Sequence, residues 1–285
     1  MRVGVVDIGS NTSRLLVAEV EHGGIVPLET GRVRLALGEE IERTGSVSDT
    51  SIAAAAKAAR KLTAVARKRG VESLDIFLTA PGRQSENAEE LVDAVRRASN
   101  HPVRVLSTEE EGRLAYAGAV ATADVPLGTP VAVCDVGGAS TEIAVGSPDS
   151  DPAWVASVDL GSVRLTERTS SLGEAVAEAR YAFADVEPAR PAVALAVGGS
   201  ARATRRLVGP WLGDAELKEA FRIVAATPPR EIARRFGVDR ARARILPAGV
   251  VILAEVHELL GVPLHVCSGG IREGAVLSSV AARAA

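Results

Sequence analysis

The sequence predicts an α/β protein made of two similar halves that face each other across a gap. Three observations support this prediction. The chain of 285 residues is longer than one ordinary domain and suffices for two. Strands and helices alternate as β-β-β-α-β-α-β-α through its first part. A strand, a glycine turn and a second strand occur at 3–20 and again at 131–146, so the turn that follows Asp7 is matched by the turn that follows Asp135.

The first half is expected to open with three strands. Apolar runs of strand character lie at 2–8, 13–21, 25–37, 74–79 and 103–106. His22-Gly23-Gly24 is predicted to form the hairpin turn before the third strand.

The helices of the first half are expected at 50–69, at 86–99 and from Ser107 and Thr108 onward. Ser48 or Asp49 caps the first of these helices, and Gly70 closes it. Residues 80–84 are expected to form a loop.

Residues 122–129 are predicted to link two domains, 1–125 and 126–285, because they contain Asp124, Pro126 and Gly128. Strands of the second domain are expected at 131–137, 140–146, 153–158, 192–197 and 264–267. Helices are expected within 162–187, after 200, in broken form over 214–243, at 244–260 and after 270. The last helix is free to pack back on the first domain.

Composition excludes several classes of protein. With a net charge of −3, the surface as a whole does not attract polyanions. Any anion site must therefore be a local concentration of Arg side chains and backbone amides. Two Trp, two Tyr and four Phe argue against recognition of nucleic acid by base stacking. No apolar run reaches about 18 residues and no signal peptide is evident, so a cytoplasmic protein is expected. Cys134 and Cys267 are predicted to be inert core thiols.

The two glycine turns are the strongest candidates for a binding site. Glycine and small hydroxyl residues let backbone N–H groups approach a phosphate closely. The residues concerned are Gly9, Ser10, Asn11 and Thr12 in the first turn and Gly137, Gly138, Ala139, Ser140 and Thr141 in the second. Two matched copies favour phosphate binding over the alternative, a pair of unrelated hairpins.

Three carboxylates accompany these turns. Asp7 and Asp135 end the strands that enter the turns, and two carboxylates that face a phosphate call for a Mg²⁺ ion between them. Alternatively, each Asp accepts hydrogen bonds from its own turn. Glu142 lies two residues after Ser140, so strand alternation points it either into the cleft or onto an exposed face.

A further acidic cluster, Glu109-Glu110-Glu111, opens the helix after Thr108. Acidic side chains at a helix N-terminus interact favourably with the helix dipole, and one of them could instead hold and deprotonate an attacking water. Glycine turns at 197–200 and 267–273 also precede helices. They suit either further phosphates or a nucleotide, or simply close packing of a helix on a strand.

Seven motifs in chain order resemble the exopolyphosphatase/guanosine pentaphosphate phosphatase (Ppx/GppA) family, in its short two-domain form. This family belongs to the acetate kinase–sugar kinase–heat-shock protein–actin superfamily. The motifs are DIGSNTSRLLV at 7–17, TAPGRQSEN at 79–87, LSTEEEGRLAYAGA at 106–119, DVGGASTEIAVG at 135–146, DLGSVRLTE at 159–167, VGGSARA at 197–203 and SGGIREGAVL at 268–277. The glycine turns indicate the superfamily, and the segments at 106–119 and 159–167 indicate the family.

The resemblance implies two actin-like (ribonuclease H-like) domains with an interdomain cleft. It implies an exopolyphosphatase that hydrolyses the terminal phosphoanhydride of linear inorganic polyphosphate, with Mg²⁺ or Mn²⁺ as cofactor. It makes Glu111 the base that activates water and gives Glu142 a part in placing water or metal. Asp7 and Asp135 match the metal-side aspartates, and Arg83 matches an arginine that lies against the phosphate chain. Arg14 is expected to bind the rest of the chain together with Arg83.

The chain departs from the family pattern at three places. Ala139 replaces the third glycine of the usual D-x-G-G-G-S, and its methyl group is expected to narrow the turn. Thr108 and Gly112 replace the common Gly and Ala around the glutamates. The extra C-terminal helical region of longer members is absent from this sequence, which favours the short members and weakens the case for processive action on long polymers.

The same site also suits a pppGpp 5′-phosphatase or a nucleoside triphosphatase, since nothing in the sequence identifies a pocket for a base. A non-hydrolytic regulator that binds nucleotide or polyphosphate is the alternative from another class. A kinase is disfavoured because no insert for an acceptor substrate is evident. The expected partners are inorganic polyphosphate or guanosine and adenosine polyphosphates, with no nucleic acid and no membrane, and a homodimer is expected.

Overall fold

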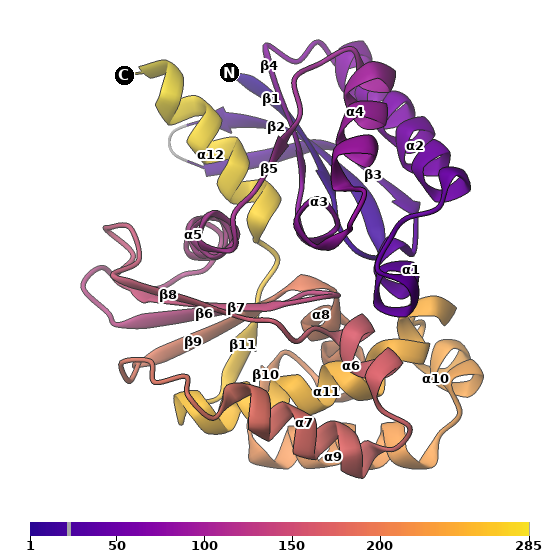
Figure 1. Ribbon diagram of the computed structural model, residues 1–285. Helices are drawn as coiled ribbons and strands as arrows, with labels where there is room; N and C mark the ends of the chain where they lie inside the picture. The colour runs from indigo at the N-terminus through magenta and orange to yellow at the C-terminus, as the bar shows by residue number, and fades with distance from the viewer. Residues whose placement is uncertain (22–23, 285) are drawn as a thin grey trace.

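Two β-sheets form the two halves of the computed structural model, which describes residues 1–21 and 24–284 (Figure 1). The strands of the first sheet are β1 (Arg2–Ile8), β2 (Thr12–Glu21), β3 (Gly24–Arg34), β4 (Ser73–Leu78) and β5 (Arg104–Val105). Their order in the sheet is β3-β2-β1-β4-β5. The predicted turn His22-Gly23-Gly24 includes residues 22 and 23, which lie outside the described residues.

The second sheet repeats the first. Its strands are β6 (Val131–Val136), β7 (Thr141–Gly146), β8 (Trp154–Val158), β9 (Val193–Val197), β10 (Trp211–Leu212) and β11 (Leu264–Val266). Their order, read from the other edge, is β8-β7-β6-β9-β11, with β10 added beyond β11. In both sheets the first three strands are antiparallel and the next two are parallel to the central strand. The predicted α/β class is confirmed, and the sequence repeat extends to the whole sheet.

The helices of the first half are α1 (Leu37–Thr44), α2 (Asp49–Lys68), α3 (Ala80–Gln84), α4 (Ala88–Ser99) and α5 (Thr108–Val120). Ser48 caps α2, where its side chain accepts a hydrogen bond from the Ser51 backbone N–H at 3.3 Å. Ser107 and Glu110 form a capping box at the start of α5. The predicted third strand was too long, since β3 stops at Arg34 and α1 follows. The predicted loop at 80–84 was also wrong, because this segment is α3.

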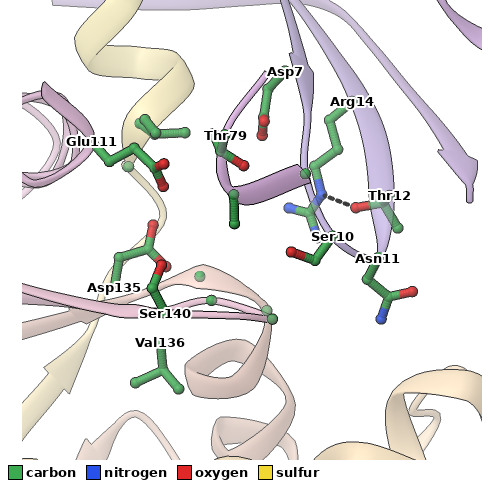
Figure 2. Close-up of a pocket in the computed structure, with 18 of the residues that line it drawn as sticks. Asp7, Ser10, Asn11, Thr12, Arg14, Thr79, Glu111, Asp135, Val136 and Ser140 are labelled. Atoms are coloured by element: carbon green, nitrogen blue, oxygen red, sulfur yellow. Dashed lines mark hydrogen bonds between the residues drawn. The ribbon is translucent and has the colours of Figure 1, made fainter. Parts of the chain in front are cut away.

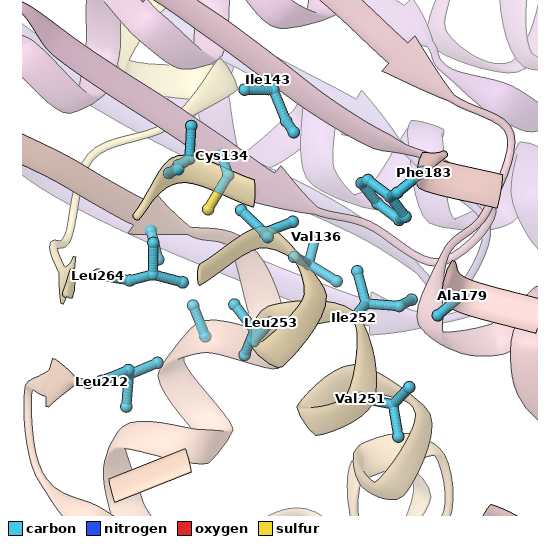
Figure 3. Packing of buried hydrophobic residues seen from close by; sticks show 14 of the residues in the cluster. Cys134, Val136, Ile143, Ala179, Phe183, Leu212, Val251, Ile252, Leu253 and Leu264 are labelled. Carbon is cyan, nitrogen blue, oxygen red and sulfur yellow. The ribbon is translucent and has the colours of Figure 1, made fainter. Parts of the chain in front are cut away.

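The helices of the second half are α6 (Ser162–Arg168), α7 (Leu172–Phe183), α8 (Gly198–Val208), α9 (Asp214–Ala226), α10 (Pro229–Phe236), α11 (Arg240–Leu260) and α12 (Ile271–Ala284). Figure 3 shows residues of α7 and α11 against one face of the second sheet, where Cys134 and Ile143 meet Phe183 and Leu253. Both cysteines are buried, Cys134 in this core. In the described part of the chain, no helix combines the length and apolar character needed to cross a bilayer.

Two helices cross between the halves. Ala115 and Ala119 of α5 pack on the second sheet, on the face opposite α11. Ala275 and Val276 of α12 pack on the first sheet, beside Val3. The two helices touch backbone to backbone, because a methyl group on Gly118 would lie 2.0 Å from the Gly270 carbonyl oxygen. The division into 1–125 and 126–285 stays a prediction.

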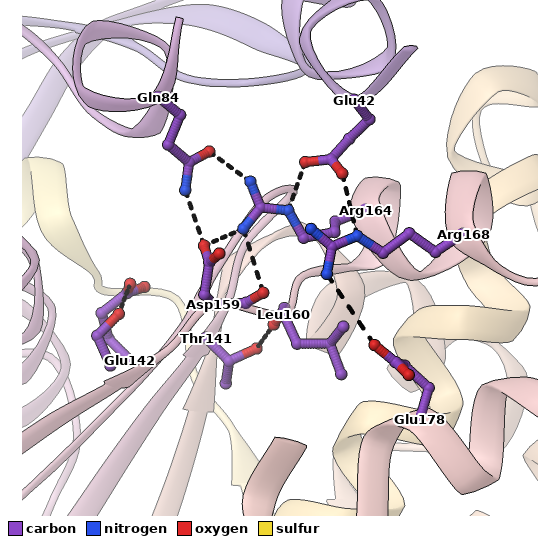
Figure 4. Close-up of polar contacts among 10 residues, drawn as sticks. Glu42, Gln84, Thr141, Glu142, Asp159, Leu160, Arg164, Arg168 and Glu178 are labelled. Atoms are coloured by element: carbon purple, nitrogen blue, oxygen red, sulfur yellow. Dashed lines mark hydrogen bonds and ion pairs between the residues drawn. The ribbon is translucent and has the colours of Figure 1, made fainter. Parts of the chain in front are cut away.

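Ion pairs join the halves beside the cleft (Figure 4). Arg164 of α6 pairs with Glu42 of α1 and with Asp159, and the side chains of Arg164 and Glu42 are only 5% and 9% exposed. Gln84 of α3 accepts a hydrogen bond from Arg164 at 2.8 Å and donates one to Asp159 at 2.8 Å. Arg168 donates to Glu42 at 3.2 Å. The four side chains around Arg164 thus hold α1 and α3 of the first half against α6 of the second.

Candidate active site

A cleft between the two sheets collects residues from both halves (Figure 2). The first glycine turn forms one wall. The Gly9 N–H donates to the Thr12 carbonyl at 3.1 Å, and the Gly38 N–H donates to the Ser10 carbonyl at 2.7 Å. The Asn11 carbonyl accepts from the N–H groups of residues 35 and 36 at 2.9 and 3.1 Å. The segment that enters α1 therefore braces this turn through its carbonyl groups.

The second turn is braced in the same way. The Gly137 N–H donates to the Ser140 carbonyl at 3.0 Å. The carbonyls of Gly137 and Gly138 accept from the first N–H groups of α6, at 2.8 to 3.1 Å. A Cβ on Gly138 would lie 3.0 Å from the Cβ of Ser10, so the tips of the two turns meet across the cleft.

The backbone N–H groups at the tips of both turns have no hydrogen-bond partner in the described structure and are free to bind a ligand. Among the described residues, the N–H groups of Ser10, Asn11, Gly138 and Ala139 make no hydrogen bond outside regular secondary structure, and these four residues lie outside the strands and helices. All four line the cleft. Clustered amides of this kind suit an anion such as a phosphate.

Ala139 fits its turn without backbone strain. The only two residues other than glycine with positive φ in the described chain are Ala36 and Asn100. Ala139 is thus outside the left-handed region that favours glycine. Its side chain is 5% exposed and lines the cleft. The replacement of the family's third glycine is therefore compatible with the conformation of this turn.

The strand registers set the charged residues beside each turn. Asp7 of β1 pairs with Arg14 of β2, and at the matching position of the second sheet Asp135 of β6 pairs with Glu142 of β7. Directly paired residues on antiparallel strands point to the same face. Each sheet therefore presents an aspartate with one neighbour, and that neighbour is a cation in the first half and an anion in the second.

Asp7 and Asp135 have no partner of their own. Neither carboxylate makes a hydrogen bond or an ion pair within the part of the chain that the structure describes. Burial raises the pKa of Asp7 to about 6, against the opposing effect of Arg272 and Arg14, and burial also raises the pKa of Asp135. Gly198, with φ of 87°, leaves room for Asp135, since a Cβ there would lie 2.2 Å from Oδ1.

This donor set fits a hard divalent cation such as Mg²⁺. The described residues contain no cluster of three or more His, Cys, Asp and Glu that would enclose an ion. Mg²⁺ is commonly held by one or two carboxylates together with substrate phosphates and water, which is what two unpartnered aspartates beside phosphate-binding turns offer. The buried Oδ1 of Asn11, which also lacks a hydrogen-bond partner, adds a further oxygen at the first turn.

Glu111 enters the cleft from the first turn of α5. Its side chain is 9% exposed and forms an ion pair with Arg83. Burial, followed by the nearby charge of Glu142, raises the pKa of Glu111 well above its usual range, and Arg83 opposes this shift. Glu142 accepts a hydrogen bond from the Ser157 hydroxyl at 3.0 Å, and burial raises its pKa to about 7. Two carboxylates thus share one desolvated corner of the cleft.

The structure brings most of the predicted site residues to the cleft. Those that line it are Asp7, Gly9, Ser10, Asn11, Thr12, Glu111, Asp135, Gly137, Gly138, Ala139, Ser140 and Glu142. Arg83 does not line it, because its guanidinium is turned to Glu111 and to the Leu106 carbonyl. Thr141 does not line it either, since its hydroxyl donates to the Leu160 carbonyl at 2.6 Å.

Sequence reasoning gave too little weight to the other basic residues of the cleft. Arg14, which was expected to bind the phosphate chain, lines the cleft, and so do Arg202, Arg242 and Arg272, for which no such role was predicted. Arg202 and Arg272 follow the third and fourth glycine turns, for which close helix packing was an equally good explanation. Arg242 belongs to the segment 214–243 that was expected to be broken, whereas α11 begins at Arg240 with Asp239 as its cap. The third and fourth glycine turns were the sequence features that could have identified Arg202 and Arg272 as residues of the cleft.

Comparisons with known proteins agree with this geometry. Residues 16–214 match the Ppx/GppA phosphatase family. Exopolyphosphatase 1 of Mycobacterium tuberculosis is 27% identical, over 97% of this chain and 88% of its own length. The guanosine-5′-triphosphate,3′-diphosphate pyrophosphatase of Pseudoalteromonas atlantica is 28% identical, over 95% of this chain and 57% of its own length. The crystal structure of the Aquifex aeolicus member of the Ppx/GppA protein family is 25% identical and matches with a TM-score of 0.84, over 99% of this chain and 98% of that one.

Fold and matches together define an enzyme with two actin-like domains that hydrolyses phosphoanhydrides. The chain belongs to the Ppx/GppA phosphatase family. The predicted family, fold class and enzyme class are confirmed.

Proposed function

We propose that this enzyme is an exopolyphosphatase, which releases phosphate from the end of linear inorganic polyphosphate. The observation that carries the proposal is the placement of the buried pair Glu111 and Glu142 beside two turns with free amides. The basic residues of the cleft add positive charge for a polyanion. No aromatic side chain lines the cleft in the described chain, so a surface for stacking a nucleobase is missing there.

Glu111 acts as the general base. Its carboxylate takes a proton from the attacking water while the water oxygen bonds to the terminal phosphorus, and the bond from that phosphorus to the bridging oxygen breaks. The products are phosphate and a chain shorter by one unit. The raised pKa of Glu111 improves its basicity near neutral pH. Glu142 lies beside Glu111 and helps to place the water. Its carboxylate is held by the hydrogen bond that it accepts from the Ser157 hydroxyl at 3.0 Å.

The amides of the two turns bind the phosphoryl oxygens, on which negative charge develops during transfer. Asp7 and Asp135, with Glu142 beside them, would hold the Mg²⁺, and the same oxygen donors suit Mn²⁺. When bound, the cation neutralises charge on the phosphate oxygens. Arg83 contributes through Glu111, whose charged form it stabilises. A homodimer and a cytoplasmic location stay predictions.

A pppGpp 5′-phosphatase is the second candidate. It is supported by the similarity to the Pseudoalteromonas atlantica relative, whose name refers to that nucleotide. The name of the Mycobacterium tuberculosis relative, which matches over more of its own length, supports polyphosphate. A non-hydrolytic regulator is disfavoured, because Glu111 and Glu142 are both in place.

Release of phosphate from a panel of substrates tests the proposal. The panel consists of polyphosphates of several lengths, pppGpp, ATP and ADP, each with Mg²⁺ and with chelator. We expect the highest kcat/KM on polyphosphate and a loss of activity with chelator. Release from nucleotides alone would overturn the proposal in favour of the second candidate.

A further inference from the structure

Two glutamates of α1 carry the ion pairs that cross between the halves. Glu42 pairs with Arg164 and, at 3.2 Å, with Arg168, both of α6. Glu39 pairs with Arg244 of α11 at 2.7 Å. In the described part of the chain, no other ion pair joins the first half to the second. These five side chains are called the clasp below. Its anions come from the first half and its cations from the second.

The pair at the centre of the clasp is buried between the halves. The side chain of Glu42 is 9% exposed and that of Arg164 is 5% exposed. With Glu42 in place, the arginines of α6 enter the interface as compensated charges. Removing one partner of a buried ion pair leaves the other charge uncompensated, which is strongly unfavourable. Without Glu42, an open arrangement that returns Arg164 to water is therefore favoured over the closed one.

Each partner of this pair belongs to a helix that is fixed to one of the two glycine turns. At the start of α1, the Gly38 N–H donates to the Ser10 carbonyl at 2.7 Å, and in α6 the N–H of Arg164 itself donates to the Gly138 carbonyl at 3.1 Å. A Cβ on Gly38 would lie 2.7 Å from the Cβ of Ser10, and a Cβ on Gly161 would lie 2.5 Å from the Gly138 carbonyl oxygen. No side chain therefore separates either helix from its turn.

The clasp thus sets the spacing of the two turns. Their free amides line the same cleft, and both can bind the same phosphate chain only at a fixed separation. In Figure 1 the contact between α1 and α6 lies at the end of the cleft away from the crossing of α5 and α12. At this end the halves are joined by side chains, whereas at the crossing they touch backbone to backbone. Closure of the cleft at the turns therefore depends on the charges of the clasp.

We propose that Glu42 and Arg164 are positioning residues, which hold the two glycine turns at the separation where both bind the same phosphate chain. This inference rests on the proposed role of the turns in binding phosphate and adds a determinant of affinity that does not touch the substrate. If only the closed arrangement binds, the apparent Kd equals the intrinsic Kd divided by the closed fraction. The clasp thereby sets the affinity from outside the binding surface.

Equilibrium binding tests the clasp. Tripolyphosphate is titrated with Mg²⁺ into Glu111→Gln, as the parent without turnover, and into the same parent carrying Glu42→Gln. We expect Glu42→Gln to raise the Kd about tenfold, as the closed fraction falls to about one tenth. Glu42→Asp keeps the charge and is expected to restore most of the affinity. Arg168→Gln changes an exposed side chain that folding does not require, and a smaller rise in Kd is expected.

Glu167→Gln is the matched control. Glu167 lies on α6 and pairs with Arg244 at 3.3 Å, so this ion pair stays within the second half. The control is expected to keep the Kd of the parent. If Glu42→Gln also kept this Kd, and only lowered the midpoint of thermal unfolding, the pair would be merely structural and the inference would be overturned.

Solution scattering separates this inference from the proposed function. The radius of gyration is measured without substrate for the wild type, Glu42→Gln and Glu167→Gln. We expect a larger value for Glu42→Gln alone, and an unchanged value would reject the clasp. Because no substrate is present, this comparison holds even if the enzyme proves to act only on nucleotides. A parent that failed to bind tripolyphosphate, with the scattering as expected, would count against the proposed function and not against the clasp.

Discussion

The two halves of the molecule differ at matching positions of the same sheet. Across β1, β2 and β3 the row of paired residues is Asp7, Arg14, Arg32. Across β6, β7 and β8 it is Asp135, Glu142, Ser157. Strand order, register and glycine turn are shared, and the two rows differ in everything after the aspartate.

The difference between the two rows suggests that the two halves of the repeated fold have different tasks. In the proposed mechanism, the cation beside Asp7 makes the first half a surface for the substrate's negative charge. The anion beside Asp135, with Glu111 brought next to it by α5, would make the second half the place where water is activated. The glycine turns are common to both halves, whereas the residues proposed to activate water are not.

The largest effect on kcat is expected for Glu111, which belongs to α5 and to neither row of paired strand residues. Glu111→Gln keeps the shape of the side chain and removes the base, so kcat is expected to fall about 10²–10⁴-fold. Phosphate release and polyphosphate binding are measured on the same preparation. Binding is expected to stay close to wild type, and near-normal turnover would end the assignment of the base. Glu109→Gln, at the exposed start of α5, is the matched control.

The next effect compares the two matching positions directly. Glu142→Gln is expected to lower kcat about 10²-fold with little change in KM, because it acts on the reacting corner. Arg14→Gln is expected to raise KM about tenfold, because it removes a charge that binds the substrate. Glu21→Gln, at the exposed end of β2, serves as control. If both variants changed the same kinetic parameter, the division between the halves would be wrong.

A smaller effect concerns pH. Glu111 must be deprotonated to act as base, and its pKa is raised by burial and by Glu142 but held down by Arg83. kcat/KM should therefore fall on the acid side at a pH well above that of an exposed glutamate. Arg83→Gln removes the opposing charge, raises the pKa further and moves this fall to higher pH.

Arg113→Gln is the control for the pH profile, because Arg113 pairs with Glu109 on the exposed side of the same helix. It should leave the profile in place. A profile of Arg83→Gln that coincided with wild type, or moved to lower pH, would contradict the role of Arg83.

The smallest effect is expected for Ala139→Gly, which restores the family's third glycine. Since residue 139 does not need a positive φ, kcat/KM is expected to change about twofold or less. The added freedom of the unfolded chain should lower the free energy of unfolding by about 0.4–1 kcal/mol, measured by denaturant titration. A large gain in activity would show that the methyl group obstructs the second turn.

Most of the regular structure could be predicted because its signals are local. The apolar strands around Asp7 and Asp135 end at their glycine turns, and the cap at Ser107 marks the start of α5. The exceptions depend on distant contacts. Helix α1 follows Ala36, whose φ of 60° is held where Asn11 accepts two hydrogen bonds from the backbone, and no local pattern indicates this.

The candidate site divides in the same way. Its aspartates, its turns and Glu142 belong to two short repeated motifs and could be found from spacing alone. Arg202 and Arg242 could not, because they come from two helices far apart in sequence and most basic residues of the chain are arginine. Side-chain direction was the other gap. Arg83 was predicted to bind the phosphate chain, and the structure directs its guanidinium to Glu111, which the spacing of the motif does not determine.

The crossing of α5 and α12 restricts how the cleft can open. Each helix leaves the sheet that precedes it and covers the other, and the two backbones meet where Gly118 faces Gly270. The N-terminus of one carries Glu111, and that of the other carries Arg272. We expect this crossing to be the pivot of any rotation of the halves, because it is where their backbones are in closest contact. Arg272 lies two residues from Gly270 and would move little in such a rotation, whereas the tips of the two glycine turns would separate.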